Sequence, residues 1–236
     1  HTEAALRVIV IGGGIMGLCT ALSLRRSGHR VALYEQGPIP NPAGSSVDHH
    51  RLIRHPYGPL SGYARLIDPA IAAWDRVWKT VGQRLFHPTG TIAMARGDGS
   101  WIEQSLKDMA DLGIATEVLD AAGLQRRAPM LHSDGIELAA WIDSGGVLFA
   151  DRIVAAVAKQ LVLSGATVHT HTPVIEIDTA RGAIALEDGT RARADALVVA
   201  CGPWVRSLAP STVGRMKPAT PSGPSLQRRV APALRQ

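Results

Sequence analysis

The pattern of apolar and polar positions at the start of the chain predicts three regular elements. Residues 7–11 form a run rich in β-branched side chains that ends on glycine, which is typical of a buried parallel strand. Residues 15–27 have the composition of a helix that ends at Gly28, and residues 30–34 predict a second strand. This order indicates the beginning of a strand–helix–strand unit.

The middle of the chain does not continue this alternation of strand and helix. Residues 37–60 hold Gly, Pro, Ser and His without a clear period and predict a long loop. Residues 62–80 have apolar positions at helical spacing, and we expect Trp74 and Trp78 to pack in the core. The elements predicted after this helix are strands at 91–95, 114–118 and 136–142 and helices at 101–112 and 121–127. They indicate an inserted α+β domain.

The last third of the chain returns to longer apolar runs and clear turn signals. Asp188-Gly189 is a turn signal between short strands, which predicts an antiparallel meander. The predicted elements are a helix at 152–163 closed by Gly165, and strands at 167–170, 173–178, 183–187 and 196–200. Gly, Pro and Ser dominate from Pro210 onward without a period, which predicts a disordered tail.

Composition and charge exclude several classes of protein. With 236 residues, of which 46% are hydrophobic and 19% charged, the chain is globular and holds one or two domains. Five of the 25 basic residues and none of the 20 acidic residues follow Ser211. The body is therefore neutral, and we expect no nucleic-acid partner. The two cysteines, Cys19 and Cys201, fit a reducing compartment, so we expect a cytoplasmic protein.

One uncharged stretch, residues 8–24, has the apolar character of a membrane helix or a signal anchor. Four glycines lie close together within it and would make a poor helix there, so we expect no membrane segment. The chain begins with His1 rather than Met, so either its start is processed or the sequence is a fragment.

Gly12, Gly14 and Gly17 form a GxGxxG pattern between the first strand and the first helix. The first glycine permits a tight turn, the second lets the backbone approach a pyrophosphate, and the third lets helix and strand pack closely. The phosphates then lie at the helix N-terminus. Glu35 ends the second strand, where a carboxylate binds ribose hydroxyls and disfavours a 2′-phosphate. The pattern predicts a dinucleotide site, and we expect no metal site.

The organisation after Glu35 favours FAD over NAD as the dinucleotide. An ordinary NAD enzyme would continue directly into further βα units. This chain instead has a long loop, an insertion and a return through a meander to ALVVACGPW. It resembles the FAD-dependent oxidoreductases related to D-amino acid oxidase. The cofactor contacts that the resemblance implies outside the glycine pattern and Glu35 are Ile15, Met16, Gln36, the backbone of Val174, and Cys201, Gly202 and Trp204.

Residues 44–58, GSSVDHHRLIRHPYG, narrow the resemblance to the group of sarcosine oxidase, N-methyltryptophan oxidase and pipecolate oxidase. In that group a pair of small residues near the pyrophosphate is followed by an R-x-x-R-x-x-Y pattern. The matching residues are Ser45, Ser46, Arg51, Arg54 and Tyr57. The resemblance implies that Arg51 lies against the flavin ring and that Arg54 grips the carboxylate of the substrate. A planar guanidinium fork suits that task.

One position departs from the pattern of this group. Val47 stands where the group often has a histidine that faces the flavin, so either His49 or His50 substitutes or the contact is lost. We expect His49 to act in catalysis beside Arg51, Arg54 and Tyr57, by tuning local charge or assisting proton movement. A solvated basic loop is the alternative for this segment.

The resemblance covers about residues 7–208 and implies an α/β fold. The expected fold is a Rossmann-like FAD-binding domain, with a parallel sheet and an antiparallel meander, that carries an inserted and incomplete α+β substrate domain. The expected boundaries are 1–82 and 145–208 for the FAD-binding domain, 83–144 for the partial substrate domain and 209–236 for a basic tail.

The implied activity is the FAD-dependent oxidation of a secondary amine, an N-methyl or cyclic amino acid, to an imine, with O₂ reduced to H₂O₂. One alternative is a truncated, catalytically silent chain that binds FAD poorly. The other is an FAD-dependent dehydrogenase of a 2-hydroxy acid or of glycerol phosphate. Bound flavin separates the silent chain from the other two, and release of peroxide separates the oxidase from the dehydrogenase.

Overall fold

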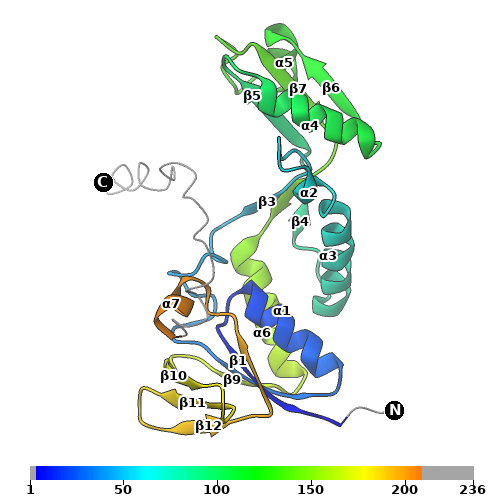
Figure 1. The fold of residues 1–236 in the computed structure, drawn as a ribbon. Helices are drawn as coiled ribbons and strands as arrows, with labels where there is room; N and C mark the ends of the chain where they lie inside the picture. The colour runs from blue at the N-terminus through cyan, green and yellow to red at the C-terminus, as the bar shows by residue number, and fades with distance from the viewer. Residues whose placement is uncertain (1–3, 209–236) are drawn as a thin grey trace, which may run out of the picture.

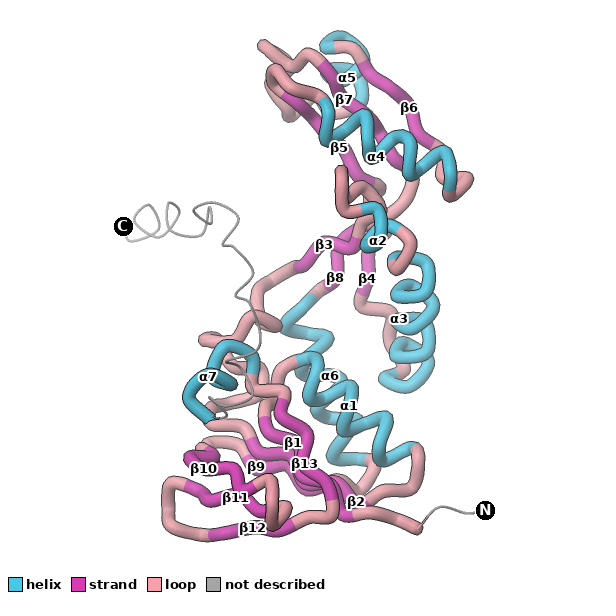
Figure 2. Tube along the Cα trace, viewed as in Figure 1, coloured by secondary structure: helices cyan, strands magenta, loops and turns pink. Residues whose placement is uncertain are grey.

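The computed structural model describes residues 4–208, and its lower part is an α/β lobe built on a parallel sheet (Figures 1 and 2). The sheet has four strands in the order β13–β1–β2–β9, and every neighbouring pair is parallel. The strands are β1 (Arg7–Ile11), β2 (Arg30–Tyr34), β9 (Thr167–His169) and β13 (Ala196–Val199).

Both faces of this parallel sheet are buried. On β1, Val8 and Val10 pack into the cluster formed with α1 (Ile15–Arg26) and α6 (Ala150–Leu163). Ile9 and Ile11 pack on the opposite face against an antiparallel meander. The meander consists of β10 (Val174–Asp178), β11 (Ala183–Leu186) and β12 (Arg191–Arg193). Burial on both sides explains why β1 is apolar at every inner position instead of alternating.

A small antiparallel sheet lies above the α/β lobe, between it and the upper part of the molecule (Figure 2). Its strands are β3 (Arg51–Ile53), β8 (Gly146–Leu148) and β4 (Phe86–His87), with β8 in the centre. Beside it are α2 (Ser61–Ala64) and α3 (Ile67–Val81). On α3 the rings of Trp74 and Trp78 stack with centroids 5.0 Å apart, and Trp78 is buried in the core of the lower lobe.

The upper part, which we call the upper lobe, is a third antiparallel sheet with one helix on each face (Figure 1). Helix α4 covers one face through Ile102 and Met109, which pack on Ala140 of the central strand. Helix α5 covers the other face through Leu124, which packs on Ala139. The elements are β5 (Thr91–Ala95), β7 (Leu138–Ile142) and β6 (Thr116–Leu119), with α4 (Ser100–Asp111) and α5 (Ala121–Arg127).

The mixed α/β architecture expected from the sequence is confirmed, with corrections to individual elements. The segment 37–60 is not one continuous loop, because β3 forms within it by pairing with β8. The helix expected over 62–80 is divided at Arg65 and Leu66 into α2 and α3. In the described part of the chain, no helix is both long and apolar enough to cross a membrane. The tail expected at 209–236 lies outside the described residues.

Candidate cofactor site

A cavity of about 550 Å³ lies at the carboxyl ends of the parallel strands of the lower lobe. It is lined by the ends of β1, β2 and β13, by loop residues between Asn41 and Val47, and by the one-turn helix η1 (Gly202–Trp204). In open parallel sheets, ligands bind in a crevice of this kind because strand ends and helix N-termini meet there. The site is therefore positioned by the fold itself.

Two glycines of the GxGxxG turn are required by the packing of the protein. Gly12 has φ +111°, and a Cβ built on it would lie 2.5 Å from the carbonyl oxygen of Ala200. A Cβ on Gly17 would lie 1.9 Å from the carbonyl oxygen of Gly12. Neither position can hold a side chain without moving backbone, so both glycines are needed for β1, α1 and β13 to approach each other.

Gly14 differs from its two neighbours in the turn. A Cβ there would meet only the flexible side chain of Ser46, whose Oγ would lie 3.2 Å away. Gly14 is the N-cap residue of α1 and lines the cavity. The absence of a side chain at this position therefore leaves space in the cavity beside the helix N-terminus, where the helix dipole and the amides of the first turn favour an anion.

The carboxylate of Glu35 forms the second polar feature of the cavity. Its Oε2 accepts a hydrogen bond from the Gly13 N–H at 2.7 Å. Its Oε1 accepts from the Gly37 N–H at 3.0 Å and from the Asn41 side-chain amide at 2.8 Å. A carboxylate offers about four acceptor positions, so this buried group is fixed in orientation and keeps capacity for one further donor.

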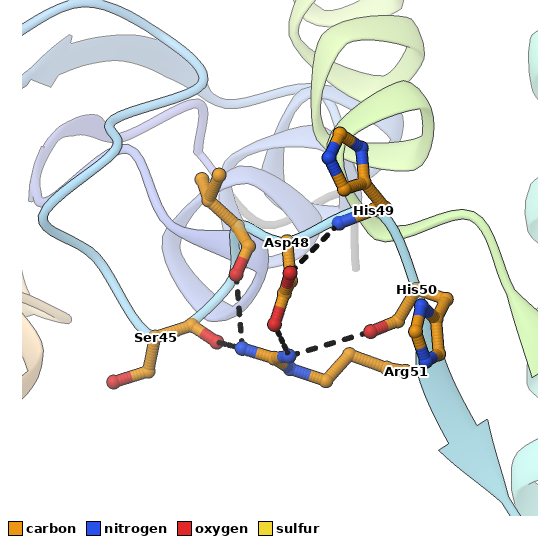
Figure 3. A network of polar contacts seen from close by, with 6 residues as sticks. Ser45, Asp48, His49, His50 and Arg51 are labelled. Atoms are coloured by element: carbon orange, nitrogen blue, oxygen red, sulfur yellow. Dashed lines mark hydrogen bonds and ion pairs between the residues drawn. The ribbon is translucent and has the colours of Figure 1, made fainter. Parts of the chain in front are cut away.

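The loop of residues 45–48 closes the cavity beside the glycine turn, and Arg51 holds this loop in place (Figure 3). The guanidinium donates to the carbonyl oxygens of Ser45 and Val47 at 3.0 and 2.9 Å, and it pairs with the Asp48 carboxylate at 2.7 Å. The contact with Arg51 and a hydrogen bond from the His49 N–H together lower the pKa of Asp48. The Oγ of Ser46 accepts a hydrogen bond from the Ile15 N–H at 3.0 Å.

The structure brings together nearly all residues predicted to contact the cofactor. The residues of that set that line the cavity are Gly12, Gly14, Met16, Glu35, Gln36, Ser45, Ser46, Val174, Cys201, Gly202 and Trp204. Gly17 instead lies against the backbone of Gly12, and the partly buried Ile15 side chain packs against the core between the sheet and helices α1 and α6.

The four residues predicted to be catalytic do not line this cavity. Arg51 uses its guanidinium to hold the loop, and the rings of His49 and His50 point away from that guanidinium (Figure 3). Arg54 and Tyr57 follow strand β3 and lie near the upper lobe, where the Arg54 guanidinium is 5.7 Å from the ring of Trp101. The predicted catalytic set is therefore spread over two places.

Sequence reasoning missed two residues with clear structural roles. Asn41 fixes Glu35, although nothing in its Pro-rich segment marks it as a partner of that carboxylate. His55 is 2% exposed, with Nδ1 2.8 Å from the Ser144 Oγ and Nε2 3.0 Å from an Asp68 oxygen. Both partners of His55 are distant in sequence, so only the folded chain reveals this contact.

Cys19 and Cys201 both have free thiols. Burial, together with the nearby carboxylate of Glu35, raises the pKa of Cys201, which lines the cavity. Burial also raises the pKa of Cys19 in α1. Both thiols are therefore protonated at neutral pH. Within residues 4–208, no group of three or more His, Cys, Asp and Glu side chains converges as metal ligands would.

A parallel sheet with a glycine turn, an open helix N-terminus and a fixed carboxylate at the next strand end defines a dinucleotide-binding protein. The chain belongs to the DAO family of FAD-dependent oxidoreductases, whose model matches residues 7–228. Membership in this family implies FAD as the cofactor. The match continues beyond Leu208, where the resemblance was expected to stop.

The chain is also similar to individual amine and amino acid oxidases. The chain is 26% identical over 203 residues to monomeric sarcosine oxidase of Bacillus sp. (strain B-0618), covering 85% of this chain and 52% of that protein. It is 25% identical over 206 residues to N-methyl-L-tryptophan oxidase of Yersinia pestis (strain Pestoides F), covering 86% and 55%. The open form of the amino acid oxidase NikD matches with a TM-score of 0.74 at 25% identity, covering 89% and 54%. The chain thus spans about half the length of these relatives.

Proposed function

We propose that the cavity binds FAD, with the pyrophosphate at the N-terminus of α1. The observation that carries this proposal is the space beside Gly14, where a Cβ would intrude on the cavity but on no backbone atom. Amides at a helix N-terminus bind phosphate oxygens, and the Ser46 hydroxyl lies next to them, 3.0 Å from the Ile15 N–H. These groups fit a pyrophosphate.

The adenosine half of FAD would extend along the carboxyl end of β2. There Glu35, held by three donors, has an acceptor position left for a ribose hydroxyl. The same negative charge disfavours a 2′-phosphate. Val174 and the turn of residues 201–204 line the cavity and would supply further contacts. The division into an FAD-binding domain of residues 1–82 and 145–208 and a partial substrate domain of 83–144 belongs to the same proposal.

We further propose that the reaction is the oxidation of a secondary amine of an amino acid to an imine, which water then hydrolyses. When bound, FAD supplies a two-electron acceptor that O₂ reoxidises with formation of H₂O₂. In this proposal Arg54 binds the substrate carboxylate, since its planar fork matches that group. Arg51 holds the loop that carries Ser45 and Ser46 against the cofactor cavity.

The test combines cofactor analysis with an oxidase assay. The purified chain is denatured, and the released flavin is identified and quantified. Peroxide release is then measured with sarcosine, N-methyltryptophan and pipecolate, and with 2-hydroxy acids as the contrasting class. The proposal predicts FAD as the released flavin and peroxide only with amines. If FAD is released but the chain oxidises no amine and instead transfers electrons from a 2-hydroxy acid to a dye, the chain is a dehydrogenase and not an oxidase. Absence of FAD would contradict the proposal as a whole.

A further inference from the structure

Arg54 lies in a short segment, residues 54–58, between β3 and α2, which packs against α4 of the upper lobe through Gly58, and we call this segment the strap. Arg54 is partly buried. Among residues 4–208, no carboxylate pairs with it and no acceptor takes a hydrogen bond from it. An arginine in such a place keeps five N–H donors for an external acceptor.

Two aromatic rings lie against this guanidinium. Its central carbon is 5.2 Å from the ring centroid of Tyr57 and 5.7 Å from that of Trp101. Tyr57 is itself stacked on Tyr63, with centroids 5.5 Å apart. Aromatic rings attract a cation through their faces, and they leave the N–H edge of the planar group free for an acceptor. The rings therefore set the plane of the fork without competing for its donors.

Trp101 comes from α4 of the upper lobe, and its ring has a fixed place on the strap. A Cβ on Gly58 would lie 2.2 Å from Trp101 Cδ1, so the ring packs directly on this glycine. The Gly58 N–H donates to the Ser105 Oγ at 2.8 Å, and that hydroxyl donates to the Trp101 carbonyl at 2.9 Å. These contacts fasten the first turns of α4 to the strap.

The strap is fixed at a second point, directly beside Arg54. His55 is buried, and its two ring nitrogens contact Ser144 and Asp68 at 2.8 and 3.0 Å. The buried ring of His55 thus fixes the backbone next to Arg54, while the Trp101 ring lies against the Arg54 side chain. Such double support is what a binding arginine needs to keep one orientation.

We propose that Trp101 is a positioning residue that, together with Tyr57, orients Arg54 to bind the carboxylate of an amino-acid substrate. This inference rests on the proposed function, in which Arg54 is the carboxylate-binding group. It adds that the orientation is set by a residue of the upper lobe, so that substrate binding depends on the contact between α4 and the strap.

The first test measures the arginine directly and needs no activity. In an ¹⁵N-labelled chain the Nε–Hε signal of Arg54, assigned by its loss in Arg54→Lys, should carry a ring-current shift. Trp101→Leu should remove this shift, and Trp101→Phe should keep part of it. Trp141→Leu is the matched control, because it removes the ring that lies 4.2 Å from the Arg127 guanidinium elsewhere in the upper lobe. An Arg54 signal that does not respond to Trp101→Leu overturns the inference.

The second test measures substrate binding with N-methylglycine as the probe. Trp101→Leu should raise the apparent KM or Kd about 5- to 30-fold, the equivalent of a desolvated cation–π contact. The kcat should change less, and Trp101→Phe should restore most of the affinity. If Arg54→Lys weakens binding and Trp101→Leu does not, the inference fails and the proposed function stands. If Arg54→Lys has no effect, the carboxylate contact of the proposed function fails, and the inference fails with it.

Discussion

The cofactor cavity and the strap are polar regions of the same chain, but they are organised in different ways. At the cavity the chain supplies its own partners: Glu35 accepts from three donors, and Arg51 donates to the loop that carries Ser46. At the strap, Arg54 is held by aromatic faces and has no acceptor within residues 4–208. The first region is organised before any ligand arrives, whereas the second orients a donor for a group that must come from outside.

The contrast does not extend to the burial of apolar side chains, which is similar in the two lobes. Val10 and Leu33 are fully buried in the lower lobe, as are Met109 and Leu124 in the upper lobe. Both lobes also expose large apolar side chains, among them Met16 at 72% in the lower lobe and Val118 at 61% in the upper lobe. The two regions therefore differ in their polar contacts, and changes at the cavity should affect cofactor affinity most strongly.

The largest effect is expected for Gly14→Val. The branched side chain would fill the space proposed for the pyrophosphate, so FAD affinity should fall by more than about 100-fold. The fold should persist, because a Cβ at this position meets only the Ser46 side chain. Flavin content after gel filtration and the circular dichroism spectrum measure the two quantities separately.

The matched control for this variant is Gly62→Val in α2, where a Cβ meets no atom within 4 Å. It should leave the flavin content unchanged. Gly17→Ala should instead destabilise the fold, because its Cβ would lie 1.9 Å from a backbone oxygen. A Gly14→Val chain that retains flavin like the unmodified chain would show that the pyrophosphate lies elsewhere.

A smaller effect is expected for Glu35→Gln. The amide replaces one carboxylate oxygen by an NH₂ group, which cannot accept a hydrogen bond from Gly13, Gly37 or Asn41. Leaving a buried donor unpaired should lower the free energy of unfolding by about 1–3 kcal/mol. Urea unfolding of the flavin-free chains measures this change. Equal stability of both chains would mean that the network around Glu35 does not support the fold.

At the strap, His55→Leu should have a moderate effect. The leucine fills the buried space, but Ser144 and Asp68 lose their shared partner. Because Asp68 is 69% exposed and can be hydrated, we expect a loss of only about 1 kcal/mol. The ¹⁵N spectrum should show changes centred on residues 54–58. A loss larger than that of Glu35→Gln would contradict the ranking of the two regions.

The sequence was sufficient to predict the elements whose signals are local. The run at β1, the glycine turn and Glu35 each follow rules that involve only neighbours in sequence, and the structure has them as expected. The short strands β3, β4 and β8 were missed, because elements of two or three residues show no period and exist only through pairing with distant residues.

At the candidate sites, the residues of the family pattern could be predicted, whereas the contacts that depend on the folded chain could not. Most residues of the predicted cofactor set follow strands in a family pattern and line the cavity, so they could be predicted one by one, whereas Asn41, which also lines the cavity, was missed. The contacts of His55 with Asp68 and Ser144, and of Arg54 with Trp101, depend on how the strap packs on other elements. No sequence spacing encodes such packing. The contacts of Arg51 are with Ser45, Val47 and Asp48 of its own loop, and they depend on the conformation of an irregular loop, which has no sequence period.

The smallest effect is expected for Asp195→Asn at the start of β13. The Asp195 carboxylate pairs with the Arg7 guanidinium at 2.8 Å and accepts the Arg7 N–H, which lowers the pKa of Asp195 to about 2. The folded pKa is below the unfolded one of about 3.9. The stabilisation is therefore fully present above about pH 4 and disappears as the pH falls through about 2. Thermal unfolding of both chains should show a small difference at pH 7 that vanishes in acid.

The most direct test of the account is a titration of the flavin-free chain with FAD, followed by the quenching of flavin fluorescence. We predict binding of one FAD per chain, displacement by ADP, which contains the pyrophosphate and adenosine that the cavity should hold, and weak or no binding of FMN. Binding of FMN with the same affinity as FAD, or failure of ADP to compete, would contradict the assignment of the cavity at Gly14 and Glu35 to a dinucleotide.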